Sequence, residues 1–475
     1  MKRTKIICTL GPASSNEETI TAMLKNGMNV ARINFSHGTH EQHKKTIALF
    51  RKVRDKLKYP AAVMLDTKGP EIRTGEYDEK TFLRSGQRFT LSTEQVKGTA
   101  ETCSISFSDL PKSIKAGARV LIDDGQIELT VNEITETEIH CTVIDGGYIS
   151  SHKGVNIPHV HLNMPYLSEK DKNDLLFGIE NDVDFIAASF VRTKEDVIDI
   201  RKFLDYNGGH DIKIISKIEN NEGVENFDDI LEHSDGIMVA RGDMGVEIEY
   251  EKLPGIQKKF IKKCYQSGKM VITATQMLES MINNASPTRA EITDVANAVF
   301  DGTSAIMLSG ETAVGKHPAR VVAVMAKIAE QAENDAFEMK HYRGIQYDTD
   351  ASDRTNAICD AACTTARDLN ARAIIAVTKS GYTARRVSKF RPIQPIVAST
   401  PEAKTFHQLS MSWGVYPVLA LSQKSQEHLF RHAIDCAKQI DIVSGGDCVV
   451  IIAGVPLDTC GATNMIKVES VPKSR

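Results

Sequence analysis

The chain has 475 residues, of which 41% are hydrophobic and 25% charged, so it is long enough for two or three domains and has a globular composition. Its 58 basic and 62 acidic residues give a net charge of −4, which excludes a general nucleic-acid binder. No apolar run approaches ~20 residues and the N-terminus lacks a signal-peptide pattern, so we expect a cytoplasmic protein without a membrane partner.

Up to about residue 340, short apolar runs alternate with amphipathic segments, which predicts parallel strands joined by helices. The eight runs are Thr4–Leu10, Met28–Ile33, Ala61–Leu65, Asp184–Phe190, Ile212–Ile215, Gly236–Ala240, Met270–Ala274 and Ser304–Leu308. Eight such units close a (β/α)8 TIM barrel, whose active site lies at the carboxyl ends of the strands.

More than one hundred residues separate the third and fourth strands, and much of this interval alternates polar and apolar residues between glycine turns. This pattern predicts a small antiparallel β-barrel domain at residues 69–165, inserted into the TIM barrel formed by residues 1–68 and 166–340. An insertion over the barrel mouth could act as a lid that excludes water.

After a polar linker the strand–helix alternation resumes and predicts an open α/β domain at residues 350–475. The nine cysteines lack CxxC spacing and lie mostly in apolar contexts, which favours buried free thiols over a zinc site.

Charged and polar residues follow six of the predicted strands. At any one strand end, loop chemistry or a surface salt bridge is the simplest interpretation. Six ends that meet at one mouth favour a ligand site, because uncompensated charges would repel one another or lose solvation there. These residues are Arg32, Asn34, Ser36, His37, Asp66, Thr67, Lys68, Lys217, Glu219, Arg241, Gly242, Asp243, Thr275, Gln276, Ser309 and Glu311.

The residue types suit phosphoryl transfer. Lysines and arginines stabilise the transferring oxygens, while Glu219 and Asp243 offer the oxygen ligands that Mg²⁺ prefers. Neither GxxxxGK[ST] nor GxGxxG is present, which argues against a P-loop or Rossmann nucleotide site.

Six motifs, in order, closely resemble the pyruvate kinase family: RINFSHG, LDTKGPEIRTG, SKIEN, VARGDMGVEI, ITATQMLESM and PTRAEITDVANAVFDGT. The resemblance covers essentially the whole chain. It implies transfer of the phosphoryl group of phosphoenolpyruvate to ADP, followed by protonation of the enolate to pyruvate.

The resemblance implies that Glu219 and Asp243 bind Mg²⁺ (or Mn²⁺), that Lys217 and Arg32 contact the phosphoryl group, and that Thr275 lies near the protonated carbon. Lys217 could instead form a strand-end salt bridge, and Thr275 could be a threonine bonded to backbone. The substrate would contact Arg32, Lys217, Ala240, Arg241, Gly242, Asp243 and Thr275, with its carboxylate at a helix N-terminus.

The nucleotide ADP or ATP would contact Asn34, His37, Arg73 and Lys153, although His37 could equally be a capping or packing residue. A K⁺ site is implied for Asn34, Ser36, Asp66 and Thr67. In the family, a glutamate at the position of Glu71 accompanies dependence on K⁺, and a lysine there accompanies independence of K⁺. The physical reason is that a lysine ammonium could supply the positive charge that K⁺ otherwise brings.

In the terminal domain, a predicted strand-to-helix turn carries hydroxyls, a glycine and helix N-terminal amides that suit a phosphate. A capped helix with a solvated basic face would have the same sequence pattern. The resemblance favours an effector site at Thr378, Lys379, Ser380, Gly381, Tyr382 and Thr383. The loop at residues 453–464 lacks the tryptophan and arginine found in many members activated by fructose 1,6-bisphosphate. AMP or a sugar monophosphate is therefore an alternative phosphorylated effector.

A homotetramer is expected from the resemblance alone. Two other hypotheses fit these residues less well. A Mg²⁺-dependent enolate lyase would have little use for Lys217, Arg73, Lys153 or a lid, and a non-catalytic sensor should have lost Lys217 or a metal carboxylate.

Overall fold

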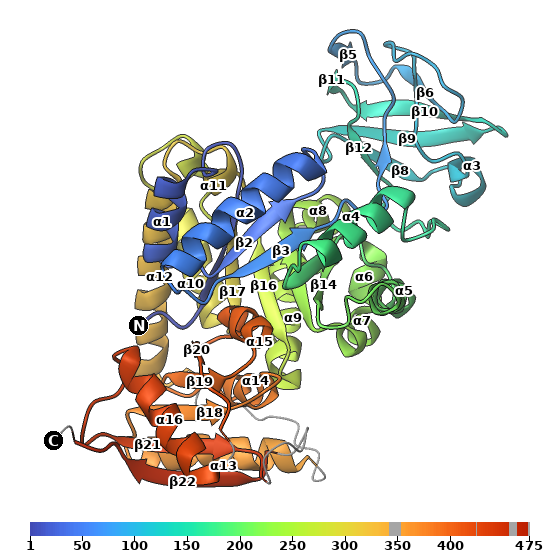
Figure 1. Ribbon diagram of the computed structural model, residues 1–475. Helices are drawn as coiled ribbons and strands as arrows, with labels where there is room; N and C mark the ends of the chain where they lie inside the picture. The colour runs from blue at the N-terminus through green and yellow to red at the C-terminus, as the bar shows by residue number, and fades with distance from the viewer. Residues whose placement is uncertain (342–352, 424, 456–462, 474–475) are drawn as a thin grey trace.

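The computed structural model describes residues 1–341, 353–423, 425–455 and 463–473. Eight parallel strands form a closed barrel in the order β1-β17-β16-β15-β14-β13-β3-β2, which confirms the predicted (β/α)8 barrel (Figure 1). The strands are β1 (Lys5–Thr9), β2 (Val30–Asn34), β3 (Ala62–Asp66), β13 (Phe185–Ala188), β14 (Lys213–Ile218), β15 (Gly236–Ala240), β16 (Met270–Ala274) and β17 (Ala305–Leu308).

The barrel strands are continuous apolar runs because both of their faces are buried. Alternate residues such as Ile7, Met64 and Ile272 pack in the interior of the barrel. Their neighbours, such as Ile6 and Leu65, pack outward against the helices. The surrounding helices are α1 (Glu17–Lys25), α2 (His40–Lys56), α4 (Glu169–Glu180), α5 (Lys194–Tyr206), α6 (Asn221–Glu225), α7 (Phe227–His233), α8 (Arg241–Glu247), α9 (Leu253–Ser267), α10 (Arg289–Phe300), α11 (Gly310–Ala313) and α12 (Pro318–Glu338).

The fourth barrel strand is shorter than predicted. β13 ends at Ala188 instead of Phe190, because Phe190 adopts a left-handed backbone conformation (φ 54°) that stops the strand. Ser189 and Phe190 therefore lie in the loop at the barrel mouth.

Between β3 and α4 the chain forms a separate β unit with its own apolar core, which stands over one side of the barrel mouth (Figure 1). A seven-stranded sheet has the order β4-β12-β8-β9-β10-β6-β7, and β11 and β5 form a second sheet. The elements are β4 (Ile72–Arg73), β5 (Thr81–Leu83), β6 (Arg88–Ser92), β7 (Thr102–Ser104), α3 (Leu110–Ser113), β8 (Arg119–Ile122), β9 (Ile127–Ile134), β10 (Glu138–Asp145), β11 (Gly147–Ile149) and β12 (Gly154–Asn156). This unit is called the lid below.

The C-terminal α/β domain is a five-stranded sheet in the order β20-β19-β18-β21-β22, with β22 antiparallel to β21. Its elements are α13 (Arg354–Asp368), β18 (Ala373–Val377), α14 (Tyr382–Lys389), β19 (Ile396–Thr400), α15 (Ala403–Gln408), β20 (Val415–Leu419), α16 (Gln426–Gln439), β21 (Cys448–Ala453) and β22 (Met465–Ser470). The sequence did not predict the two edge strands, because β20 contains Pro417 and β22 is largely exposed and charged.

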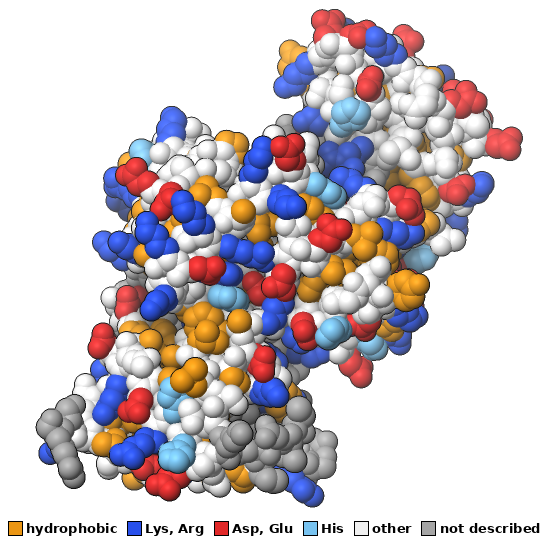
Figure 2. Space-filling view, in the orientation of Figure 1, with side chains coloured by type: hydrophobic (Ala, Val, Ile, Leu, Met, Phe, Trp, Pro, Cys, Tyr) orange, Lys and Arg blue, Asp and Glu red, His pale blue; other side chains and the backbone are white. Residues whose placement is uncertain are grey.

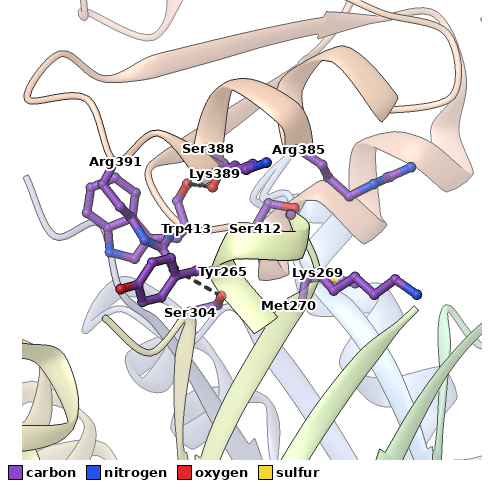
Figure 3. A pocket seen from close by; sticks show the side chains of 11 residues that line it. Tyr265, Lys269, Met270, Ser304, Arg385, Ser388, Lys389, Arg391, Ser412 and Trp413 are labelled. Carbon is purple, nitrogen blue, oxygen red and sulfur yellow. Dashed lines mark hydrogen bonds between the residues drawn. The ribbon is translucent and has the colours of Figure 1, made fainter. Parts of the chain in front are cut away.

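This domain packs on the end of the barrel opposite the lid (Figure 1). At the contact, the guanidinium of Arg391 lies 4.5 Å from the centre of the Trp413 ring (Figure 3). It also donates to the carbonyl oxygen of Gly302 at 2.8 Å. Ser388 donates to the carbonyl oxygen of Trp413 at 2.6 Å. Because Ser388, Arg391 and Trp413 all belong to the terminal domain, these contacts fix Arg391 in place, and its bond to the carbonyl oxygen of Gly302 joins the two domains.

All eight cysteines that lie in the described ranges are free thiols, as predicted; Cys460 lies outside these ranges. Within the same ranges, no helix combines the length and the apolar character needed to cross a bilayer.

Candidate active site

A cleft of about 920 Å³ lies between the lid and the carboxyl ends of the barrel strands. Four of the predicted site residues line it: His37, Arg73, Lys153 and Asp243. Figure 2 shows Lys and Arg side chains gathered where the lid joins the barrel. The cleft therefore offers cationic side chains from both the lid and the barrel, which suits an anionic ligand.

Asp66, at the end of β3, is 1% exposed and has two cationic partners. Its Oδ2 accepts from Nε of Arg32 at 2.6 Å, and its Oδ1 accepts from Nζ of Lys217 at 3.0 Å. Burial alone would raise the pKa of Asp66, but the charges of Arg32 and Lys217 outweigh it and hold the pKa below its ordinary value. Asp66 is therefore an ionised anchor for two cations.

The ammonium of Lys217 has three partners, of which two accept hydrogen bonds and the third is an ion pair. These are Asp66 Oδ1 at 3.0 Å, Ser189 Oγ at 2.7 Å and Glu219 Oε1 at 3.1 Å. Burial would lower the pKa of Lys217, but Asp66 and Glu219 raise it above its ordinary value. Lys217 is therefore held as a cation at the end of β14.

Glu219 follows Lys217 on the same strand end and is almost completely buried. Its Oε2 accepts from the peptide N–H of Phe190 at 2.6 Å. Burial raises the pKa of Glu219 to about 8, against the opposing charge of Lys217, and the nearby Asp243 adds to the increase. A buried carboxylate whose ionisation is resisted in this way, with a second carboxylate nearby, fits a site that a divalent cation would complete.

No group of three or more His, Cys, Asp or Glu side chains in the described part of the chain has the geometry of a metal site. This agrees with the chemistry of Mg²⁺, which proteins commonly hold through one or two carboxylates plus substrate oxygens and water. Glu219 and Asp243 fit that mode of binding.

Thr275 follows β16 with a left-handed backbone (φ 69°), which is an uncommon conformation for a threonine. Its hydroxyl accepts from the N–H of Gly242 at 2.7 Å and donates to the carbonyl oxygen of Ala274 at 2.6 Å. Thr275 is therefore bonded to backbone, as the simpler alternative predicts, and these bonds are compatible with the predicted position near the protonated carbon. One amide of the proposed carboxylate site at Ala240–Asp243 is bonded to Thr275.

The side chain of Arg241 is engaged on the outer side of the strand ends. Its guanidinium pairs with Asp294 at 2.7 Å and donates to the carbonyl oxygen of Thr275 at 2.6 Å. The structure thus joins Arg241 to α10 and to the loop after β16, so its backbone is the part left for a ligand.

Two predicted lid cations are paired within the lid. Arg73 binds Glu71 at 2.6 Å and the carbonyl oxygen of His152 at 2.7 Å, and Lys153 binds Asp123 at 2.8 Å. Both side chains are partly exposed at the cleft. Exposed ion pairs of this kind exchange partners at little cost.

The residues predicted to bind K⁺ lie at neighbouring ends of β2 and β3. Asn34 accepts from the N–H of Ser36 at 3.1 Å, and the hydroxyl of Thr67 accepts from the N–H of Ser189 at 3.1 Å. Asp66 is shared with Arg32 and Lys217, as described above.

The predicted effector turn joins β18 to α14, and Gly381 has the left-handed backbone (φ 77°) that begins the helix. Thr383 bonds to the hydroxyl of Thr463 at 2.8 Å, which joins this turn to the loop before β22. Residues 456–462 of that loop lie outside the described ranges.

Sequence reasoning missed three polar features at the mouth. The predicted strand Asp184–Phe190 includes Ser189, although a hydroxyl near the end of an apolar run is a usable signal for a site residue. Tyr166 donates to the carbonyl oxygen of Ser189 at 2.8 Å, and Asp124 of the lid lies near enough to Asp243 that burial and this charge raise its pKa. These contacts join segments far apart in the sequence.

Comparison with known proteins agrees with this geometry. Residues 1–322 match the family model described as pyruvate kinase, barrel domain, and residues 356–469 match pyruvate kinase, alpha/beta domain. The chain belongs to the pyruvate kinase family.

The chain is 51% identical to the pyruvate kinase of Clostridium acetobutylicum over 473 residues, covering 99% of this chain and 100% of that protein. It is 48% identical to the pyruvate kinase of Staphylococcus haemolyticus, covering 99% of this chain and 81% of that protein. A crystal structure of a pyruvate kinase from Cryptosporidium parvum superposes with a TM-score of 0.92 at 41% identity, covering 99% of this chain and 96% of that one.

Membership of the pyruvate kinase family identifies the chain as a phosphotransferase whose family substrates are phosphoenolpyruvate and ADP. The lyase and sensor hypotheses are set aside.

Proposed function

We propose that the chain transfers the phosphoryl group of phosphoenolpyruvate to ADP with the help of Mg²⁺ (or Mn²⁺) and K⁺, and then protonates the enolate to pyruvate. The observation that carries this proposal is the buried ammonium of Lys217, which lies where three strand ends meet and beside two acidic side chains.

Lys217 and Arg32 are proposed to stabilise the transferring phosphoryl group. Their charges are fixed by the shared carboxylate of Asp66, so little reorganisation is needed when negative charge develops nearby. Preorganised charges in a partly buried site are the most effective form of electrostatic catalysis.

Glu219 and Asp243 would hold the divalent ion. When bound, the ion neutralises negative charge on the carboxylate and phosphoryl oxygens of the substrate. The chain's own contribution is to keep the Glu219 carboxylate in place through the N–H of Phe190, which fixes one of its oxygens.

Thr275 is proposed to act near the carbon that receives the proton. Its strained backbone and its bond to Gly242 fix the hydroxyl over the first turn of α8. Binding of the substrate carboxylate at Ala240–Asp243 would be helped by the remaining N–H groups of this turn.

Arg73 and Lys153 are proposed to bind ADP together with Asn34 and His37, as the lid closes on the mouth. Closure would let both lid cations exchange their partners Glu71 and Asp123 for phosphate oxygens. Asn34, Ser36, Asp66 and Thr67 are proposed to hold K⁺.

We also propose a homotetramer located in the cytoplasm, in keeping with the free thiols, and activation by a phosphorylated metabolite bound at residues 378–383. The left-handed Gly381 and the hydroxyls that surround it support the effector site.

The proposal is tested by pyruvate formation from phosphoenolpyruvate and ADP, measured with and without Mg²⁺ and with K⁺ or tetramethylammonium. We expect turnover only when Mg²⁺ and K⁺ are both present. The assay is then repeated with AMP, a sugar monophosphate and fructose 1,6-bisphosphate, and absence of pyruvate in every mixture would disprove the reaction.

A further inference from the structure

Ser189 has no role in the function proposed above, yet it lies at the centre of the hydrogen bonds around Lys217. It is 2% exposed and directly follows β13, the strand that lies between β3 and β14 in the barrel. Its hydroxyl lies 2.7 Å from Lys217 Nζ, 2.6 Å from the carbonyl oxygen of Thr67 and 3.2 Å from Asp66 Oδ1.

The chemistry of these groups fixes the direction of each hydrogen bond. An ammonium has donors only, so the oxygen of Ser189 must accept from Lys217. The single hydroxyl proton is then left for the carbonyl oxygen of Thr67 or for Asp66, and the shorter distance favours Thr67. A lone pair of Ser189 is thereby aimed at Lys217.

The backbone of Ser189 is itself held on both sides. Its N–H donates to the hydroxyl of Thr67 at 3.1 Å, and its carbonyl oxygen accepts from the hydroxyl of Tyr166 at 2.8 Å. A Cβ atom at Gly69 would lie 2.7 Å from the same carbonyl oxygen, so the glycine permits the close approach. The acceptor offered to Lys217 is therefore fixed in position.

Two of the three donors of Lys217 end on this fixed frame, namely on Ser189 and Asp66, while Glu219 is an ion-pair partner of the ammonium at 3.1 Å. An ammonium anchored at two points can present its remaining N–H in one direction only. With Asp66 alone, the flexible side chain could rotate about one bond, and the direction of the third donor would be lost.

We propose that Ser189 is a positioning residue that aims the ammonium of Lys217 at the reacting phosphoryl group. The inference rests on the role proposed above for Lys217. Ser189 would act through that lysine and would not itself touch the substrate.

The test compares Ser189→Ala with Ser216→Ala. Ser216 precedes Lys217 on the same strand and is equally buried, but its hydroxyl bonds to Ser234 at 2.6 Å, away from the lysine. We expect Ser189→Ala to lower kcat about 10- to 100-fold, the range that follows from misplacing a catalytic group. Ser216→Ala should leave kcat within about twofold, because Lys217 keeps its three partners.

A readout other than turnover separates positioning from loss of structure. Mn²⁺ binding without substrate, measured by electron paramagnetic resonance, should stay within about twofold in Ser189→Ala, because Glu219 keeps its bond to Phe190. The KM for ADP should also be unchanged. Parallel losses of kcat and of Mn²⁺ binding would overturn the inference in favour of general support of the site.

A second variant keeps the Ser189 hydroxyl but removes one of the contacts that hold the Ser189 backbone. Tyr166→Phe removes the donor to the carbonyl oxygen of Ser189 and should lower kcat in the same sense but less than Ser189→Ala. Unchanged kcat in Ser189→Ala, with an active wild type, would overturn this inference alone. A wild type that forms no pyruvate would overturn the proposed function as well.

Discussion

Nε of Arg32 donates to Oδ2 of Asp66 at 2.6 Å, and both side chains are almost fully buried at neighbouring strand ends. The other oxygen of Asp66 accepts from Lys217, so one carboxylate is shared by two cations. Removing Asp66 would leave two buried cations without their shared carboxylate, which costs far more than the loss of a surface pair. The three residues therefore have to be considered as a unit.

The first prediction concerns Lys217→Met. The variant keeps the length and apolar stem of the side chain but removes the charge nearest the proposed phosphoryl group, so kcat should fall about 100-fold or more. Pyruvate release is measured under saturating substrates. The control is Lys213→Met at the other end of the same strand, where the lysine pairs with Asp235 at the protein surface and turnover should persist. Near-normal turnover in Lys217→Met would refute its catalytic role.

The barrel was predictable because its strands are short, continuous apolar runs, and because polar residues occur where each run ends. Lys217 and Glu219 could be assigned for that reason. The pairing of Lys217 with Ser189 could not be predicted, because the left-handed Phe190 that ends β13 early follows from tertiary contacts and not from local propensity.

The ion-pair partners of the lid cations Arg73 and Lys153 could not be predicted from the sequence either. Arg73 and Glu71 are close in the chain, but Lys153 and Asp123 are brought together by the pairing of β12 with β8. In the terminal domain, the edge strand β22 could not be predicted because an exposed edge need not alternate polar and apolar residues, and β20 could not because it contains Pro417.

The second prediction concerns Lys5, which lies buried between the barrel and the terminal domain. Its Nζ donates to the carbonyl oxygen of Val415 at 2.6 Å, and burial lowers its pKa to about 7, with Lys2 adding to the decrease. Between pH 7 and 10.5 the unfolded chain therefore holds a proton that the folded chain lacks, and stability rises with pH.

Relative to Lys5→Met, the wild type should accordingly gain up to about 1.4 kcal/mol of unfolding free energy per pH unit above pH 7. Urea denaturation at pH 7 and pH 9 measures this difference. Lys25→Met, on the exposed surface of α1, should show no such change. A pH-independent difference for Lys5→Met would contradict the assignment.

The third prediction concerns the contact between the barrel and the terminal domain. Arg391→Met removes the cation from the Trp413 ring and the donor from the carbonyl oxygen of Gly302. The free energy of unfolding should fall by about 2 to 4 kcal/mol, from the loss of a buried cation–π contact and a charged hydrogen bond. Arg367→Met on the exposed face of α13 is the matched control, and its denaturation midpoint should not move. Equal midpoints for the two variants would show that the interface does not depend on Arg391.

The last prediction concerns the monovalent cation. Oε2 of Glu71 accepts a hydrogen bond from Nε of Arg73 at 2.6 Å and lies 2.6 Å from its Nη2. The carboxylate therefore balances a guanidinium at the edge of the cleft. In Glu71→Lys an ammonium would stand beside Arg73 and supply the positive charge that K⁺ otherwise brings. Turnover in tetramethylammonium should then reach about the rate measured in K⁺, whereas the wild type should be nearly inactive without K⁺.

The control for this charge reversal is Glu76→Lys, at an exposed position of the lid beyond β4. It changes the net charge by the same amount, so it should remain dependent on K⁺ if the effect is local. If Glu71→Lys still requires K⁺, a lysine at this position does not replace the cation. If Glu76→Lys also loses its requirement, the effect belongs to the overall charge of the lid and not to the position of Glu71.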